Sequence, residues 1–326
     1  MKRENIIGRA NVDDTPELEA YYRELEGEAL GALWNVANEI EPWYPQPKSV
    51  PTLWKWKTIE RFVRRAPELV SAEKAARRVV MLVNPGRKEW SAAAGLLYTG
   101  VQVMNPGEFT SAHRHQASAL RFVMEGRGAY TVVDGEKMTL GARDLVLTPN
   151  GTWHDHGIEA DGTQCIWQDG LDIPLMNSLD ANFYEVHPQV MQTPAPLSRE
   201  NWSKPYSPQF IYKWDESYAA VKAHGVHDYR NPLTGGPIMP TMGARLELIR
   251  GSGNPRRHTG SVIYQVASGH GWSEVGGQRF EWEEKDIFCV PSWALYRHGA
   301  SSDAVLFSFN DFPAMKALSL WREASV

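Results

Sequence analysis

Cysteine is scarce in this sequence, and long apolar runs are missing. The 326 residues include only two cysteines, Cys165 and Cys289, which cannot form a CxxC or CxxH metal motif. We expect both to be buried thiols in a reducing compartment rather than a disulfide. No run approaches the roughly 18 apolar residues of a membrane span, and the first residues lack the apolar segment of a signal peptide. The sequence therefore predicts a cytoplasmic protein with no membrane partner.

Basic charge is not in excess either. The formal net charge is −5 at pH 7, and the short cluster RFVRR at 61–65 is amphipathic rather than a basic tail. We therefore expect no nucleic-acid partner. What the chain does have is apolar material, with 42% hydrophobic residues over a length sufficient for about two domains.

Residues 1–78 are predicted to form a helical and extended N-terminal arm. Thr15 is a candidate N-cap, and apolar residues then recur at three- and four-residue steps, which predicts a helix within 14–40. A second short helix is expected at 59–70, broken by Pro67. Several of the 13 tryptophans lie in this part of the chain and indicate packing of the arm or a subunit contact.

From Val79 onward the chain is predicted to be all-β. Short runs such as VVMLV, ALRFVM and DLVLTP are separated by NPG, DG and PNG turns, a pattern typical of a sandwich or barrel. We place one β unit at 79–190, a polar, proline-containing connector at 191–232 and a second β unit at 233–326.

An internal repeat supports two copies of one β unit. The segment 119–157 can be laid over 262–299, with two glycines of a Gly-x-Gly motif matching at a constant spacing. After a gap of one residue, Asp144 matches Asp286, and a proline follows at the same distance in both copies.

Histidines gather in the first copy. His113 and His115 are two residues apart on a predicted strand, so both side chains point to the same face. His154 lies five residues after Pro149, with His156 two further on, so three imidazoles can converge in one barrel. Three histidine ligands leave positions open on a non-haem iron for a chelating substrate and dioxygen, although imidazole also suits Zn, Cu and Ni.

The spacing around these histidines resembles the two motifs of the cupin superfamily, whose fold is a double-stranded jelly roll. The matching residues are Gly107, His113, His115, Gly126, Asp144, Pro149, Gly151 and His154. A glutamate that cupins commonly place shortly after the second histidine is missing, because Ala119 and Leu120 stand there. Without this carboxylate, a divalent metal keeps its full charge for an anionic chelate.

Longer segments resemble the gentisate 1,2-dioxygenase family of bicupins, which includes salicylate and 1-hydroxy-2-naphthoate dioxygenases. They include TPNGTWHDHG (148–157), WQDGLDIP (167–174), PTLWKW (51–56) and NPLTGGPIMPT (231–241). The resemblance implies an all-β bicupin with two jelly-roll barrels and a helical N-terminal extension, Fe(II) as cofactor and a homotetramer. It implies extradiol-type cleavage of gentisate by O2 to maleylpyruvate, with salicylate and 1-hydroxy-2-naphthoate open as substrates.

Charge and family position indicate which residues face an aromatic acid. Arg121 lies an even number of residues after His115, which aims it into the same barrel, and a buried arginine beside a dication suits an arriving carboxylate. Arg77 or Arg78 is expected to complete this clamp, as the N-terminal arm does in the family. Gln102 and Tyr98 occupy family pocket positions and could equally pack the barrel.

His156 and Asp169 are the candidate proton-transfer pair, because a histidine beside a carboxylate is held in one tautomer. Asp169 could equally cap a turn.

In the second copy, Arg256, His258 and Tyr296 replace the three histidines. We therefore expect a structural barrel without a metal there. Two other classes remain open: a non-catalytic bicupin that binds an aromatic acid or sugar, and a metal-dependent isomerase or decarboxylase on the same fold.

Overall fold

The computed structural model describes residues 12–13, 15–87, 92–193, 195–196 and 210–325. These residues fall into two units, 1–46 and 47–326. Parts of the predicted arm and connector, 1–11 and 197–209, lie outside the described residues. No helix in the described ranges is long and apolar enough to cross a bilayer.

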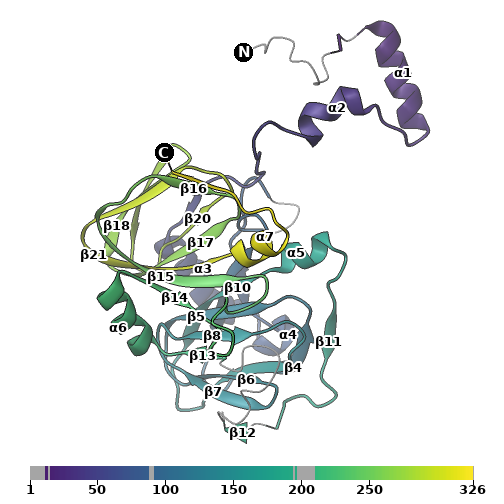
Figure 1. Ribbon diagram of the computed structural model, residues 1–326. Helices are drawn as coiled ribbons and strands as arrows, with labels where there is room; N and C mark the ends of the chain where they lie inside the picture. Colours follow the sequence, from purple (N-terminus) through teal and green to yellow (C-terminus); the bar gives the residue numbers. More distant parts are fainter. Residues whose placement is uncertain (1–11, 14, 88–91, 194, 197–209, 326) are drawn as a thin grey trace. The chain divides into compact units, whose positions relative to one another are not determined.

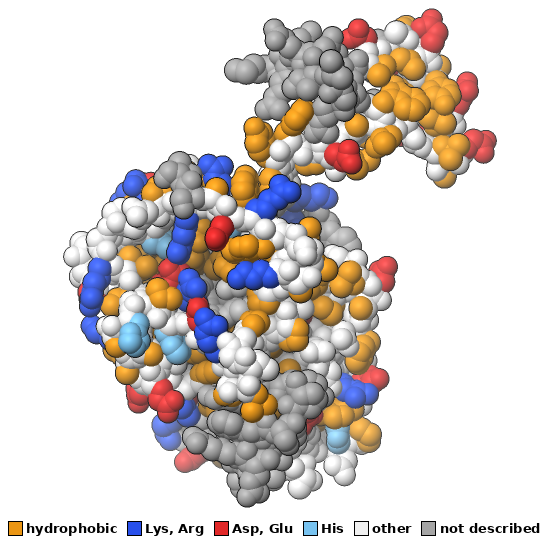
Figure 2. Space-filling view, viewed as in Figure 1, with side chains coloured by type: hydrophobic (Ala, Val, Ile, Leu, Met, Phe, Trp, Pro, Cys, Tyr) orange, Lys and Arg blue, Asp and Glu red, His pale blue; other side chains and the backbone are white. Residues whose placement is uncertain are grey.

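The N-terminal unit holds two helices, α1 (Pro16–Gly27) and α2 (Leu33–Ile40), where the sequence predicted one. Thr15 is the N-cap of α1 as predicted, and its hydroxyl accepts a hydrogen bond from the Leu18 amide at 3.2 Å. The Trp34 indole donates to the Tyr22 hydroxyl at 3.1 Å and ties the two helices together. Figure 2 shows hydrophobic side chains gathered on the visible face of this unit, with acidic side chains around them.

The first β unit is a jelly roll of eight strands (Figure 1). One sheet has the order β3-β10-β5-β8 and the facing sheet the order β4-β9-β6-β7. Their bounds are β3 (Tyr98–Met104), β4 (Phe109–His115), β5 (Ala119–Glu125), β6 (Ala129–Val133), β7 (Glu136–Leu140), β8 (Leu145–Thr148), β9 (His154–Ile158) and β10 (Cys165–Leu171). The hairpin between β6 and β7 turns at Asp134 and Gly135, both with positive φ, as a two-residue turn of this kind requires.

The second β unit repeats this order, with β15-β21-β17-β20 in one sheet and β16-β21-β18-β19 in the other. The 15-residue strand β21 serves both sheets: Tyr296–Gly299 pairs with β18, and Val305–Asn310 pairs with β17. The bounds are β15 (Gly243–Ser252), β16 (Arg256–His258), β17 (Val262–Ser268), β18 (His270–Val275), β19 (Gln278–Glu283), β20 (Ile287–Val290) and β21 (Tyr296–Asn310). The predicted bicupin fold is confirmed, as two jelly-roll sandwiches and not as closed barrels.

The two jelly rolls exchange their leading segments. β1 (Thr52–Trp54) pairs with β20 of the second jelly roll, and β13 (Ile211–Tyr212) pairs with β8 of the first. A Lys-Trp pair follows each strand and binds one buried aspartate. Lys55 lies 2.5 Å from Asp286, and Lys213 lies 2.7 Å from Asp144. The repeat is therefore longer than the sequence indicated, and it runs into both the predicted arm and the predicted connector.

A helix follows each exchanged strand, namely α3 (Trp56–Leu69) and α6 (Trp214–His224). The predicted break of α3 at Pro67 is wrong: the helix continues to Leu69, because a proline so near the C-terminus removes only one backbone hydrogen bond of the last turn. The remaining elements are α4 (Ala72–Ala75), β2 (Val79–Met81), α5 (Ile173–Ser178), β11 (Tyr184–Val186), β12 (Ala195–Pro196), β14 (Val226–Tyr229), α7 (Phe312–Ala317) and β22 (Glu323–Ser325).

The largest apolar core lies between the jelly rolls. The outer faces of β3-β10-β5-β8 and β15-β21-β17-β20 pack against each other, and the rings of Phe122 and Phe307 stack there at 4.0 Å between centroids. Because side chains alternate along a strand, each inner face is left to line its own jelly roll. The inner face of the first unit carries Arg121, Asp169 and Gln102. The interior of the second contains an apolar cluster with five aromatic residues, namely Tyr264, Phe280, Trp282, Phe288 and Tyr296.

Candidate metal centre

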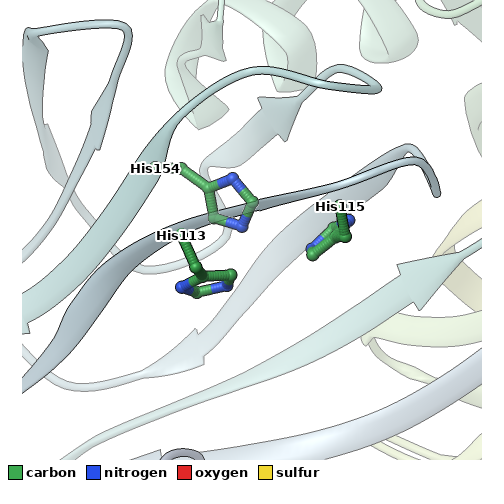
Figure 3. Close-up of side chains that lie close together, drawn as sticks. All are labelled: His113, His115 and His154. Carbon is green, nitrogen blue, oxygen red and sulfur yellow. The ribbon is translucent and has the colours of Figure 1, made fainter. Parts of the chain in front are cut away.

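Three histidines meet inside the first jelly roll. His113 and His115 come from β4, and His154 comes from the neighbouring strand β9, where it lies directly opposite His113. Their rings face a common space (Figure 3). The nitrogen atoms that could ligate a metal all lie within 4.8 Å of one another, and no Asp, Glu or Cys of the described ranges joins the cluster. His113 and His115 therefore lie on one face of β4, as the alternation predicted, and His154 joins them from β9.

Backbone carbonyls orient all three rings. Each Nδ1 lies within hydrogen-bond distance of a carbonyl oxygen, namely that of Ser111 at 2.7 Å, Ala117 at 2.7 Å and Thr152 at 3.0 Å. A carbonyl can only accept, so each Nδ1 carries the proton, and the lone pair lies on Nε2. All three Nε2 atoms are buried without a hydrogen-bond partner in the described structure. Buried acceptors without partners are costly, and a bound cation would satisfy all three.

Burial also keeps these histidines in the ligating, neutral form. It lowers the pKa of His113 to about 3 and that of His115 to about 4, and the positive charge of Arg77 acts in the same direction. The pKa of His154 lies well below its usual range, first because of burial and then because of the other two histidines. The three imidazoles therefore fit a divalent metal at neutral pH, with the charge of the metal left uncompensated by any ligand.

Arg121 and Asp169 form a buried ion pair on the facing sheet. They lie opposite each other on β5 and β10, with Arg121 Nε 3.2 Å from Asp169 Oδ1, and Arg121 also donates to the Thr148 hydroxyl at 3.1 Å. Burial raises the pKa of Asp169 to about 6, against the opposing effect of Arg121. Burial lowers the pKa of Arg121 to about 10, so the arginine keeps its charge at neutral pH.

His156 has a different partner from the one expected. The sequence paired it with Asp169, but its Nδ1 lies 2.8 Å from the Thr131 hydroxyl, and Asp169 is held by Arg121. The ring lies 5.4 Å from that of His154, and its Nε2 is buried with no partner among the described residues. Burial, followed by the charge of Arg121, holds its pKa well below the usual range. His156 is therefore a neutral base beside the three-histidine cluster.

The two pocket positions on β3 differ in character. Gln102 is buried, and neither polar atom of its amide has a hydrogen-bond partner in the described ranges. Tyr98 is only partly buried, and burial together with the charge of Asp169 raises its pKa. An unsatisfied amide aimed into the jelly roll is suited to bind a ligand oxygen.

The structure distinguishes the two neighbouring arginines. Arg78 is buried in an ion pair with Glu108 and donates to the Val70 carbonyl at 3.3 Å. Arg77 instead lines a cavity of about 530 Å³ that also includes His113. Its guanidinium lies 5.9 Å from the centre of the Tyr184 ring, which stacks on His113 at 5.2 Å.

Tyr184 was not identified from the sequence. It lies on β11, a three-residue edge strand that pairs with β4, and its register partner is His115. A single tyrosine on so short a strand has no periodicity to mark it, and only the pairing brings it to the cavity.

In the second jelly roll, two of the residues that replace the three histidines bind each other: His258 Nε2 lies 2.8 Å from the Tyr296 hydroxyl. The third, Arg256, forms an ion pair with Glu247 at 2.9 Å. His298, which aligns with His156, likewise has a hydroxyl at its Nδ1, that of Ser273 at 2.7 Å.

Comparison with known proteins adds to this geometry. A family model described as a cupin domain matches residues 100–174. The chain is 37% identical to gentisate 1,2 dioxygenase 1 of Aquipseudomonas alcaligenes, over 95% of this chain and 97% of that one. It is 34% identical to 5-aminosalicylate 1,2-dioxygenase of Comamonas sp, over 94% and 90% of the two chains. The crystal structure of salicylate 1,2-dioxygenase from Pseudoaminobacter salicylatoxidans, an adduct with gentisate, superimposes with a TM-score of 0.89 at 32% identity, covering 97% and 95%.

Proposed function

Because the chain belongs to the gentisate 1,2-dioxygenase family of cupin enzymes, we propose that it cleaves the ring of gentisate with O2 to give maleylpyruvate. We propose Fe(II) as the metal, bound by His113, His115 and His154. One observation carries the proposal: three buried Nε2 atoms without partners face one another beside a buried arginine. When bound, the iron would hold an aromatic acid and dioxygen in one site and so remove the entropic cost of their encounter.

The residues of the chain would bind and orient the acid. The absence of a carboxylate ligand leaves the full metal charge for an anionic substrate. Arg121 lies on the inner face of one sheet, and Arg77 lies in the cavity beside His113, so both are suited to a carboxylate. Gln102 offers an unpartnered amide to a hydroxyl group of the ring.

His156 would handle the proton of a ring hydroxyl. In the tautomer whose Nδ1–H donates to the Thr131 hydroxyl, the buried, neutral Nε2 is the acceptor for this proton. Asp169 would act through Arg121, because it fixes the position of the guanidinium and balances its charge before an acid arrives. This assignment separates a residue that moves a proton from one that only orients a charge.

Other acids of the same class are candidate substrates. Relatives of similar identity are named for 5-aminosalicylate and for 1-hydroxy-2-naphthoate. These names support testing salicylate and 1-hydroxy-2-naphthoate beside gentisate.

We also propose a homotetramer located in the cytoplasm. Large apolar side chains of the N-terminal unit, among them Leu30, Leu33 and Ile40, are exposed in the single chain and would be covered by another subunit. Cys165 and Cys289 are free and buried, which suits a reducing compartment. Light scattering on the purified chain would test the subunit number, and a monomer would contradict it.

The test of the enzyme compares two neighbouring histidines. His154→Ala should lose iron, whereas His156→Ala should keep iron and turn over slowly, by a factor of about 10² to 10⁴. Iron content and oxygen consumption are measured with gentisate, salicylate and 1-hydroxy-2-naphthoate. His270→Ala, at an exposed histidine of β18, is the matched control and should change neither quantity. Loss of iron in His156→Ala with retention in His154→Ala would reverse the ligand assignment, and no oxygen uptake with any of the acids would contradict the proposed reaction.

A further inference from the structure

The second jelly roll has a cavity of its own, at the position that corresponds to the histidine cluster of the first. Its volume is about 380 Å³, within the range of small-molecule sites. The strand register shows which positions of the two interiors correspond. Tyr264 and Ser308 are paired in the second jelly roll, at the positions that Arg121 and Asp169 occupy in the first. Arg256, at the repeat position of His113, projects into the cavity wall. A fixed cationic side chain therefore stands where the first jelly roll has a metal-binding side chain.

The cavity is lined by more positive than negative side chains. Four Lys and Arg side chains face three carboxylates. Arg256 contacts Glu247 at 2.9 Å through one terminal nitrogen, and Arg245 contacts Asp228 at 2.6 Å through Nε. A guanidinium has five N–H donors, so each arginine keeps donors for a further anion. Both arginines are only partly buried, and the free donors can reach the cavity.

Aromatic rings form another part of the wall. Trp321 stacks on His258 with 5.5 Å between centroids, and the ammonium of Lys316 lies 5.0 Å from the centre of the indole ring. The guanidinium of Arg256 lies over the Tyr296 ring, 5.0 Å from the ring centre. Flat apolar surfaces beside guanidinium donors match a ligand with one flat ring and one anionic group.

We propose that this cavity binds a small aromatic monocarboxylate. Its carboxylate would lie on Arg256 and Arg245, and its ring against Trp321 and Tyr296. The surplus of one positive charge matches a monoanion, and the volume admits a single-ring acid. The site needs neither a metal nor the reaction proposed for the first jelly roll, so it would hold the acid without cleaving it.

The test is equilibrium dialysis of labelled benzoate against the full-length chain. We expect two benzoate molecules per wild-type chain. Arg256→Gln should remove one of them by raising its Kd at least about tenfold. Arg279→Gln, at an exposed arginine of β19 outside the cavity, should leave both in place. His154→Ala should keep the benzoate molecule whose binding depends on Arg256, which distinguishes this site from the proposed metal centre.

A second variant distinguishes loss of the binding site from misfolding of the chain. Lys316→Glu changes an exposed residue at the rim and should weaken binding of the same benzoate molecule by several-fold, while circular dichroism stays unchanged. Full benzoate stoichiometry in both Arg256→Gln and Lys316→Glu would overturn the proposal. Loss of all benzoate binding in His154→Ala would equally overturn it, because the only site would then be in the first jelly roll.

Discussion

Replacing Arg121 with glutamine should extend the pH dependence of the protein's stability to higher pH. Arg121 and Asp169 are 2% and 4% exposed, so their ion pair of 3.2 Å is largely shielded from water. Glutamine keeps much of the side-chain volume but leaves the Asp169 carboxylate buried without an opposing charge. Breaking a buried pair in this way typically costs about 3 to 5 kcal/mol.

The sign of the pH effect follows from the pKa of Asp169. Burial raises it from 3.8 to about 6 in the folded chain, so the folded state binds more protons than the unfolded state between these values. Wild-type stability therefore decreases through this group as pH rises from about 4 to 6, by about 3 kcal/mol in all. In Arg121→Gln the pKa of Asp169 rises further, so the loss of stability with increasing pH continues above pH 6. The cost of the substitution should thus be about 1 to 2 kcal/mol near pH 4.5, from the lost contact with Thr148, and the full amount near pH 7.5.

Urea unfolding at the two pH values, with a chelator present so that no metal contributes, measures both costs. Asp169→Asn and the double variant complete a double-mutant cycle, and the double variant should recover most of the stability at pH 7.5. In the presence of iron, Arg121→Gln should keep its metal and raise the KM for carboxylated substrates. An equal cost of Arg121→Gln at both pH values would refute the coupling to Asp169, and an unchanged KM would remove Arg121 from substrate binding.

Three further predictions concern the frame that holds the two sites. Phe307→Ala should destabilise the chain by about 3 to 5 kcal/mol in urea unfolding and keep a single transition, and a separate early transition of one jelly roll would contradict the shared core. Lys213→Met and Lys55→Met should each cost about 1 to 2 kcal/mol in the same assay, since both leave a buried aspartate without its lysine, and unequal costs would contradict the equivalence of the exchanged segments. Burial raises the pKa of Asp311 to about 6, so the free energy of unfolding of the wild type falls through this group as pH rises from about 4 to 6. Because Asp311→Asn lacks this group, its free energy of unfolding relative to wild type should increase by about 3 kcal/mol between pH 4 and 7. A difference in free energy that does not change with pH would refute this prediction.

The sequence predicted the inner face of the first jelly roll well, because alternation along a strand is a local property. His113 and His115 are two residues apart on β4, and this spacing alone places them on the same face. Arg121 lies on the next strand, β5, and its inward position is set by the pairing of β5 with β10 and β8. The internal repeat likewise predicted two copies of one β unit.

Features set by distant segments could not be predicted in the same way. The choice between Arg77 and Arg78 is made by Glu108, which captures one of two adjacent arginines. The exchange of β1 and β13 depends on pairing across the chain, with Lys55 and Asp286 separated by 231 positions. Local periodicity contains no information about such partners, and short strands such as β1 are too brief to show a pattern.

Comparison of the two jelly rolls also shows which features of the site are common to the fold and which are specific to the proposed catalytic site. A hydroxyl at the histidine Nδ1 occurs in both jelly rolls, as Thr131 with His156 and Ser273 with His298, and both Nε2 atoms are buried without a partner in the described structure. This pair is therefore a feature of the jelly roll and does not by itself mark an acid-base residue.

What differs is the surroundings of the two imidazoles. His298 lies against the rings of Tyr264 and Tyr296, at 4.7 and 5.4 Å, whereas His156 lies beside His154 and feels the charge of Arg121. A proton acceptor needs a substrate within reach, and among the described residues only the first jelly roll places three neutral metal-binding nitrogens next to that acceptor. The proposed role of His156 thus follows from its neighbours on β9 and β5 rather than from the histidine itself. His298 occupies the corresponding position in the second jelly roll, where we expect no proton transfer.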